Sequence, residues 1–271
     1  MGMFINTNVG AINANRNLSF NNTQMSKTME KLSSGYRINR AADDAAGLAI
    51  SEKMSYQING LNQAQRNAQD GISLLQTAEG DLTEVHSMLQ RMNTLANQAA
   101  NGTYQNEDRG NLQKELKQLQ NEINRITQNS NFNGVNLLKS SGSVKFQIGV
   151  TASETLTVTL SSNQVSALGI SAISVSTQTK AASALAKIKS AISKVSTNRA
   201  NLGAYQNRLE HTINSLGVTS ENLSAANSRI KDADMATEMT AFTKNQILVQ
   251  AGTAMLAQAN SAPQAVLKLL G

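Results

Sequence analysis

The side chains that could support catalysis are few and poorly placed for it. The chain of 271 residues contains two histidines, His86 and His211, and no cysteine. Neither histidine has a second ligand at the i, i+4 spacing by which one helix presents two groups to a zinc ion. Without cysteine there is no thiolate metal site and no cysteine nucleophile. We predict that both histidines lie at the surface or beside a helix packing seam, and that the chain binds no metal or cofactor.

Three groups of carboxylates are close in sequence: Asp43 with Asp44, Glu107 with Asp108, and Asp232 with Asp234. Such groups could perform general acid–base catalysis if a pocket enclosed them. Each group instead falls near an expected helix boundary, where a carboxylate accepts hydrogen bonds from free backbone amides. The sequence also lacks a phosphate-binding glycine loop and a serine nucleophile elbow. It therefore predicts that the protein is not an enzyme.

The charge distribution argues against nucleic acid and membrane as partners. The net charge is +6, but the 24 Lys and Arg residues are scattered singly and in pairs, without a basic run or interleaved aromatic residues. No segment approaches the roughly 20 apolar residues of a membrane-spanning helix. The first 17 residues also lack the basic and apolar regions of a secretory signal, so we expect no secretory signal of the usual kind.

Apolar residues recur at an interval of seven, which predicts long helices that each keep one face against partner helices. With one Pro and only 3% aromatic residues, the helices should be uninterrupted and their core aliphatic. Four series carry the pattern: Phe4, Ala11, Leu18, Met25 and Leu32; Met54, Leu61, Ala68, Leu75, Leu82, Leu89 and Ala96; Ile188, Val195, Leu202, Leu209, Leu216, Leu223 and Ile230; and Met235, Phe242, Val249 and Leu256. From the two long series we predict an assembly seam of seven leucines: Leu75, Leu82, Leu89, Leu202, Leu209, Leu216 and Leu223.

The middle of the chain differs in composition. A shorter helix is expected after Asn106, a plausible N-cap, with apolar residues at Leu112, Leu116, Leu119, Ile123 and Ile126. Asn, Gly, Ser and Thr then dominate, with two alternating runs that predict a β-hairpin: Val144, Phe146 and Ile148, followed by Leu156, Val158 and Leu160.

The predicted fold class is mainly α. We expect an elongated antiparallel helical rod, similar to a coiled coil, with a small β-hairpin region at about residues 130–179 and with paired N- and C-terminal helices. Residues 1–42 with 234–271 form one expected domain, and residues 43–233 form the rod. Two weakly apolar terminal helices bury little against each other, so we expect them to become stably ordered only when further chains surround them.

Several motifs resemble those of bacterial flagellin. Residues 33–39 read Ser-Ser-Gly-Tyr-Arg-Ile-Asn, and residues 43–50 read Asp-Asp-Ala-Ala-Gly-Leu-Ala-Ile. The resemblance extends through residues 69–73, and at the other end through residues 207–213, 221–223 and 254–260. It covers both terminal regions, which make up more than two thirds of the chain.

The resemblance implies a structural subunit that polymerises with itself into the flagellar filament for motility. Its location would be extracellular, reached by the flagellar type III export apparatus. Further implied partners are an export chaperone, the flagellar cap and the hook-filament junction proteins. A hook-filament junction protein is the alternative within this resemblance. A flagellin-like enzyme with an inserted catalytic domain is excluded because the middle segment is short and has no metal motif.

In the flagellin family a patch that is buried in the filament is recognised by Toll-like receptor 5 on shed subunits. The matching stretch here is residues 89–95. The resemblance implies that Arg91, Leu95 and Glu115 make the main receptor contacts. Asn93 and Thr94 replace a more charged pair that is common in the family. Ordinary helix packing by Leu95 and a solvated charge at Arg91 is the competing interpretation.

Overall fold

The structure is a computed structural model that describes the backbone of residues 7–270 and the side chains of residues 7–261. The predicted mainly α fold with a small β-hairpin region is confirmed, whereas Phe4 lies outside the described residues. The elements in chain order are α1 (Val9–Ser34), α2 (Ala45–Ala100), α3 (Asn106–Asn129), β1 (Asn131–Phe132), β2 (Val135–Asn136), β3 (Gly142–Gln147), β4 (Thr155–Leu160), α4 (Val165–Leu168), α5 (Gln178–Lys231) and α6 (Met235–Leu270).

Two compact units share these elements. The central unit is Gln57–Glu221, and the terminal unit combines the residues up to Tyr56 with those from Asn222. The unit boundaries fall inside α2 and α5, whereas the predicted domains divide at residues 42/43 and 233/234. Each unit has its own helix pair, so the two are described separately.

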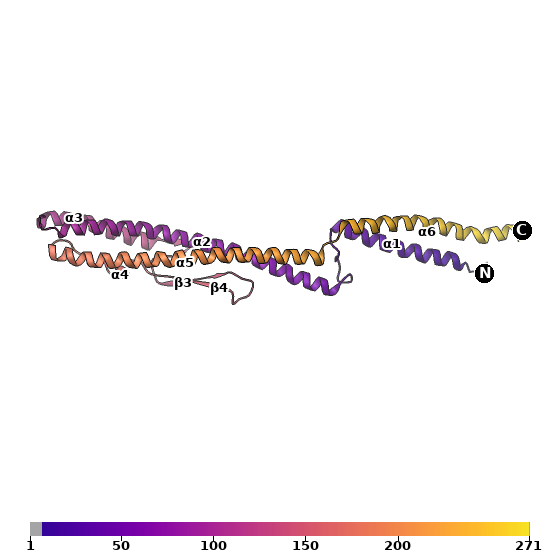
Figure 1. The fold of residues 1–271 in the computed structure, drawn as a ribbon, viewed down its shortest axis with the longest axis horizontal. Helices are drawn as coiled ribbons and strands as arrows, with labels where there is room; N and C mark the ends of the chain where they lie inside the picture. The colour runs from indigo at the N-terminus through magenta and orange to yellow at the C-terminus, as the bar shows by residue number, and fades with distance from the viewer. Residues whose placement is uncertain (1–6, 271) are drawn as a thin grey trace. The chain divides into compact units, whose positions relative to one another are not determined.

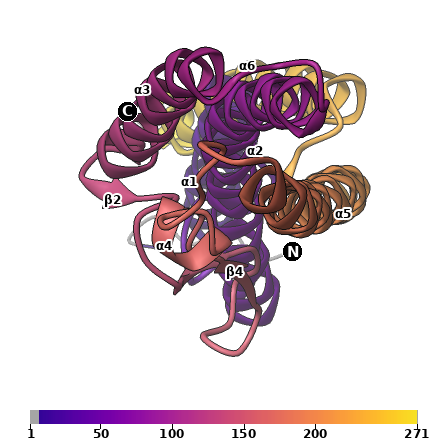
Figure 2. The ribbon, with the colours of Figure 1, turned by 90° about the vertical axis from the view of Figure 1, so that its left-hand side faces the viewer.

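In the central unit α2 and α5 run antiparallel (Figure 1). Polar contacts along the pair fix the direction: the Gln206 amide nitrogen donates to Glu79 Oε2 at 3.1 Å, and Ser220 Oγ donates to Asn62 Oδ1 at 3.0 Å. The α3 helix and the hairpin of β3 and β4 complete this unit around α2 and α5, as the end view shows (Figure 2). The chain thus folds back on itself, as the two long heptad series predicted.

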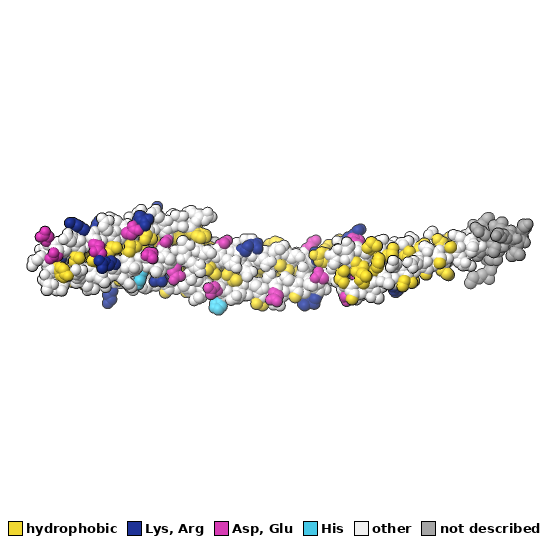
Figure 3. Space-filling model, turned by 90° about the horizontal axis from the view of Figure 1, so that it is seen from above, with side chains coloured by type: hydrophobic (Ala, Val, Ile, Leu, Met, Phe, Trp, Pro, Cys, Tyr) yellow, Lys and Arg dark blue, Asp and Glu magenta, His cyan; other side chains and the backbone are white. Residues whose placement is uncertain are grey.

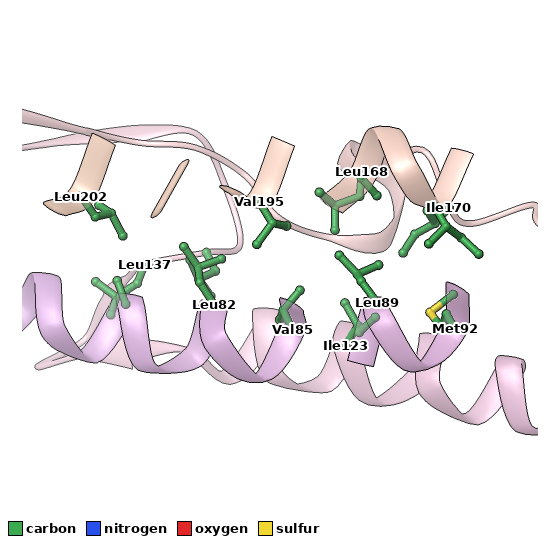
Figure 4. Close-up of a cluster of buried hydrophobic side chains, with 14 of the residues drawn as sticks. Leu82, Val85, Leu89, Met92, Ile123, Leu137, Leu168, Ile170, Val195 and Leu202 are labelled. Atoms are coloured by element: carbon green, nitrogen blue, oxygen red, sulfur yellow. The ribbon is translucent and has the colours of Figure 1, made fainter. Parts of the chain in front are cut away.

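The core of the central unit is built from the heptad positions. Leu75, Leu89 and Leu209 are completely buried, and Leu82 and Leu202 nearly so. Figure 4 shows Leu82 of α2 pointing towards Leu202 and Val195 of α5, and Leu89 of α2 pointing towards Leu168 of α4. Five of the seven leucines of the predicted assembly seam are therefore packed within a single chain. The remaining two, Leu216 and Leu223, are only half-buried.

The turn between α2 and α3 depends on a buried arginine. Arg109, 7% exposed, donates from Nε to the carbonyl oxygen of Ala99 at 2.8 Å and from Nη2 to that of Asn101 at 3.0 Å. These carbonyls lie at the C-terminal end of α2, where no helix amide remains to bond them. Asn106 is the first helical residue rather than the predicted N-cap, because Asp108 accepts the amide of Gln105 at 3.2 Å.

The predicted hairpin is present as β3 and β4, paired antiparallel with Val144 opposite Val158. Along β4, Leu156, Val158 and Leu160 are buried and the threonines between them are exposed, so the alternation predicted the buried face correctly. A second hairpin, β1 with β2, and the single-turn helix α4 were not predicted. Two-residue strands and one helical turn are too short to produce a periodic pattern.

In the terminal unit α1 and α6 run antiparallel beside each other (Figure 1). Lys31 pairs with Glu238 at 3.0 Å, and Asn8 Nδ2 donates to the carbonyl oxygen of Ala259 at 2.7 Å. Thr28 is the only buried residue of α1 among those described. The two helices therefore meet along a narrow line and bury little apolar surface. None of the helices that the structure describes combines the length and apolar composition needed to cross a bilayer.

Candidate functional site

Residues 35–44 and 230–234, which connect the helices of the terminal unit, form a hydrogen-bonded junction. Gly35 ends α1 in the left-handed conformation, at φ 74°, which glycine adopts without strain. Its carbonyl accepts the amide of Ala233 at 2.9 Å, and the Arg37 amide donates to the carbonyl of Lys231 at 2.7 Å. The Arg37 side chain reaches the carbonyl of Ile230 at 2.6 Å. Two segments distant in sequence are thereby held in one arrangement.

Three carboxylates in this junction accept backbone amides, two of them at helix N-termini and Asp43 within the loop before α2. Asp44 accepts the amide of Gly47 at 2.8 Å at the start of α2. Asp234 accepts the amide of Ala236 at 3.0 Å and the hydroxyl of Thr237 at 2.9 Å at the start of α6. Asp43 accepts the amides of Asn39 and Arg40. The prediction that these aspartates cap backbone amides is confirmed, and none of their contacts resembles an acid–base pair.

The same hydrogen bonds stabilise the ionised carboxylates. The amides of Arg40 and Asn39 lower the pKa of Asp43 below its ordinary value. The side chain and amide of Thr237 and the amide of Ala236 lower the pKa of Asp234. Because the folded pKa values lie below the unfolded ones, both carboxylates stabilise the fold above their ordinary pKa. That stabilisation is lost as the pH falls through the folded values.

We expect the substitution Asp234→Asn to make the stability of the fold fall less steeply as the pH decreases. Asparagine is as good an N-cap as aspartate but does not titrate, so the cap survives at low pH. Melting of the monomer followed by circular dichroism from about pH 6 to about pH 2 should show the wild type losing stability more steeply than the variant. Asp70→Asn, at an exposed position within α2, is the control and should keep the wild-type slope. If wild type and Asp234→Asn lose stability equally steeply as the pH falls, the capping role of ionised Asp234 is contradicted.

Both histidines lie at the surface or beside a helix packing seam, as predicted. His211 is exposed on α5, and His86 is half-buried on α2. His86 Nε2 lies 3.0 Å from the amide nitrogen of Gln90, while Nδ1 has no hydrogen-bond partner among the described residues. No group of acidic or histidine side chains in the described part of the chain could hold a metal ion.

The terminal unit exposes large apolar side chains on both helices, and Figure 3 shows apolar side chains on one face of it. We call this set the terminal apolar surface. Phe20 is 61% exposed on α1, and Ile247 is 59% exposed on α6. The members are Val9, Ile12, Phe20, Met29, Met235, Met239, Ile247, Leu248 and Met255.

Apart from Met235, the members of the heptad series in these helices lie outside the terminal apolar surface. Leu18, Met25 and Val249 are half-buried, and Gly252 lies against Leu18. The exposed set includes Phe20 and Ile247, which fall outside the series. A signal for them was present in the sequence: apolar residues occupy more of the circumference of each helix than a single seam needs.

The residues of the predicted receptor patch do not share one environment. Arg91 and Glu115 form an exposed ion pair between α2 and α3, with Arg91 Nη2 2.7 Å from Glu115 Oε1. Leu95, however, is only 1% exposed. In this structure Leu95 therefore offers almost no surface to a partner, while its expected receptor contact stays a prediction. The geometry makes it a packing residue and leaves the two charged side chains accessible.

Comparison with known proteins agrees with the helical architecture. Residues 5–143 match the bacterial flagellin N-terminal helical region, and residues 185–270 match the bacterial flagellin C-terminal helical region. The chain is 54% identical over 271 residues to a flagellin of Halalkalibacterium halodurans, which covers 99% of this chain and 100% of the relative. It is 48% identical over 285 residues to the flagellar filament 33 kDa core protein of Treponema phagedenis, with 99% and 100% covered. The crystal structure of Bacillus cereus flagellin matches with a TM-score of 0.52 at 33% identity, covering 60% of this chain and 94% of that chain.

Proposed function

Because this chain belongs to the bacterial flagellin family, we propose that the terminal apolar surface is where its copies join. The chain is a structural subunit of the extracellular flagellar filament, which forms by polymerisation of the subunit with itself, and it is not an enzyme. The proposal concerns which residues make that polymer. The observation that supports it is that large apolar side chains are exposed on both terminal helices, several of them by half or more.

The distribution of burial supports this assignment. The central unit has a continuous aliphatic core, which includes Leu75, Leu89 and Leu209 and is buried within one chain. The terminal unit has one buried residue on α1 and leaves Phe20, Ile247 and Met255 mostly in water. Covering such side chains contributes about 25 cal/mol per Å² of apolar surface removed from water. Further copies of the chain, packed around the terminal helices, would supply that cover.

The proposed filament-core domain is residues 1–42 with 234–271. Because its helices bury little in one chain, it should open easily in the monomer and be protected in the polymer. Limited proteolysis of monomer and filament tests this. We expect early cuts before about residue 40 and beyond about residue 235 in the monomer only. Cleavage at equal rates in the two states would contradict the proposed domain.

Negative-stain electron microscopy of the purified chain after salt-induced or seeded polymerisation tests whether the chain forms filaments by itself. Long tubes of uniform diameter are expected from a subunit that forms the bulk of the filament. Monomers or short caps in the presence of seeds would instead favour the hook-filament junction protein.

We also propose that the chain leaves the cell through the flagellar type III export apparatus, with an export chaperone, and meets the cap and the junction proteins outside. Family membership supports this route. Expression in a flagellated host with and without an active export apparatus tests it: the chain should appear in the medium only when the apparatus is active. Release from both hosts would contradict the route.

A receptor contact is proposed at the exposed pair of Arg91 and Glu115, with Leu95 packing beneath the surface. Arg91→Ala/Glu115→Ala should lower signalling through Toll-like receptor 5 without a change in helical content. Glu122 and Arg125 provide a matched control, because they form another exposed ion pair, at 2.5 Å, on α3. Glu122→Ala/Arg125→Ala should signal like the wild type. Undiminished signalling by Arg91→Ala/Glu115→Ala would refute the contact.

A further inference from the structure

The chain contains three Asn-Gly dipeptides, at residues 59–60, 101–102 and 133–134. Asparagine followed by glycine is prone to deamidation, because the next backbone nitrogen can attack the side-chain amide and glycine offers no side chain to obstruct it. The attack requires the asparagine backbone and side chain to rotate until that nitrogen faces Cγ. Since the three dipeptides are chemically identical, their local structure determines which of them can react.

Asn59 and Gly60 lie within α2, well away from either end. Their backbone is held by the helical hydrogen-bond ladder, so rotation would require several turns of a packed helix to open. Gly60 is also crowded: an added Cβ would lie 3.0 Å from a methyl group of Val150. This dipeptide is protected.

Asn101 is exposed just after α2, but three hydrogen bonds restrain it. Its amide donates to the carbonyl of Gln98 at 3.2 Å, and its carbonyl accepts Nη2 of Arg109 at 3.0 Å. Its side-chain oxygen accepts the amide of Thr103 at 3.3 Å. Rotation of Asn101 would break the contact with a buried arginine that closes α2. This dipeptide is partly protected.

Asn133 and Gly134 form the two-residue turn between β1 and β2, and both are exposed. Their φ angles are 47° and 82°, and Asn133 is the only described non-glycine residue with positive φ. Neither the Asn133 side chain nor the Gly134 amide makes a hydrogen bond among the described residues. Apart from its two chain neighbours, no described residue has an atom within 4 Å of a Cβ built on Gly134. The pairs next to this turn are Phe132 with Val135 and Asn131 with Asn136, and beyond them the Leu137 amide donates to the carbonyl of Ser130 at 3.1 Å.

We propose that Asn133 is the deamidation site of this chain. The Gly134 backbone nitrogen gives its proton to water or hydroxide and forms a bond to Cγ of Asn133. The bond from Cγ to Nδ2 breaks, and ammonia leaves with that proton. Water then opens the resulting succinimide at either carbonyl, which produces aspartate or isoaspartate. The net reaction consumes one water and releases one ammonia, so no other reactant is needed.

The two products differ in their effect on the turn. Aspartate adds a negative charge at an exposed position and tolerates the left-handed conformation about as well as asparagine. Isoaspartate inserts an extra carbon into the backbone, which a two-residue turn cannot accommodate while Phe132 remains paired with Val135. A subunit in an extracellular filament is no longer degraded and replaced inside the cell. The fraction of subunits modified at Asn133 should therefore rise with the age of the filament.

Peptide mapping by mass spectrometry after incubation of the full chain in ¹⁸O-labelled water at mildly alkaline pH tests the proposal. The label separates conversion during incubation from earlier conversion, and the other two dipeptides are internal controls. We expect conversion at Asn133 to be at least about tenfold faster than at Asn101 or Asn59, because opening its turn breaks fewer contacts. In urea the three rates should become similar.

The decisive comparison is between the conversion rates of the three dipeptides in the folded chain and their rates in urea. Conversion at Asn101 or Asn59 as fast as at Asn133 in the native chain would overturn the proposal. An unequal order of rates that persists in urea would also overturn it, because the selectivity would then not come from the fold. The variant Asn133→Asp should fold normally and lose the labelled product at this site.

Discussion

Replacing Phe20 with aspartate is expected to raise the critical concentration for filament growth by about a hundredfold or more. Phe20 is 61% exposed in the single chain, so the substitution removes little that the monomer needs. Burying a phenylalanine in the polymer contributes about 1.5–3 kcal/mol, and each 1.4 kcal/mol corresponds to tenfold in an equilibrium constant. Burial of an unpaired carboxylate in its place adds a further cost. Ile247→Asp on α6 should behave in the same way.

The matched controls add the same charge without removing apolar surface. Asn22 on α1 and Gln246 on α6 are exposed polar neighbours of the two apolar residues. Asn22→Asp and Gln246→Asp should polymerise at close to the wild-type critical concentration, measured by sedimentation over a range of subunit concentrations. Circular dichroism should show the same helical content for all four variants. If Phe20→Asp and Ile247→Asp polymerise like their controls, the terminal apolar surface is not where copies join.

The second large effect is on the stability of the monomer. Leu89 is completely buried between α2 and α5, and replacement with alanine leaves a cavity in the core of the central unit. We expect Leu89→Ala to lower the free energy of unfolding of this unit by about 3–5 kcal/mol. Denaturant unfolding of the monomer, with hydrogen exchange to locate the loss in the central unit, is the measurement.

Leu216→Ala provides the contrast, because Leu216 belongs to the same kind of heptad series but is only half-buried. It removes the same atoms from a side chain that still contacts water, so its cost in the monomer should be clearly smaller than that of Leu89→Ala. Equal losses for the two variants would show that the exposure of Leu216 in the single chain does not describe its environment in solution. A filament defect of Leu216→Ala beyond its effect on the monomer would identify a role between subunits.

Local signals in the sequence were sufficient to predict the long helices and the main β-hairpin. The interval of seven predicted α1, α2, α5 and α6, because an uninterrupted heptad series over many turns is compatible with little besides a helix that packs along one face. Alternation predicted the buried face of β4, and the spacing of Asp44 and Asp234 from the helices predicted their capping roles. Each of these features depends on residues within a few positions of one another, which a single sequence displays directly.

The tertiary structure alone decided what each apolar face contacts. A heptad position shows that a side chain faces a partner, but it does not show whether that partner is the same chain. Leu89 and Leu209 are enclosed within one chain because α5 returns along α2, whereas Leu216 is only half covered. Leu95 was expected on a contact surface and is buried, while Phe20 and Ile247, outside the heptad series, remain exposed. The burial of a side chain depends on which distant segments pack against it, and a local sequence pattern does not specify those contacts.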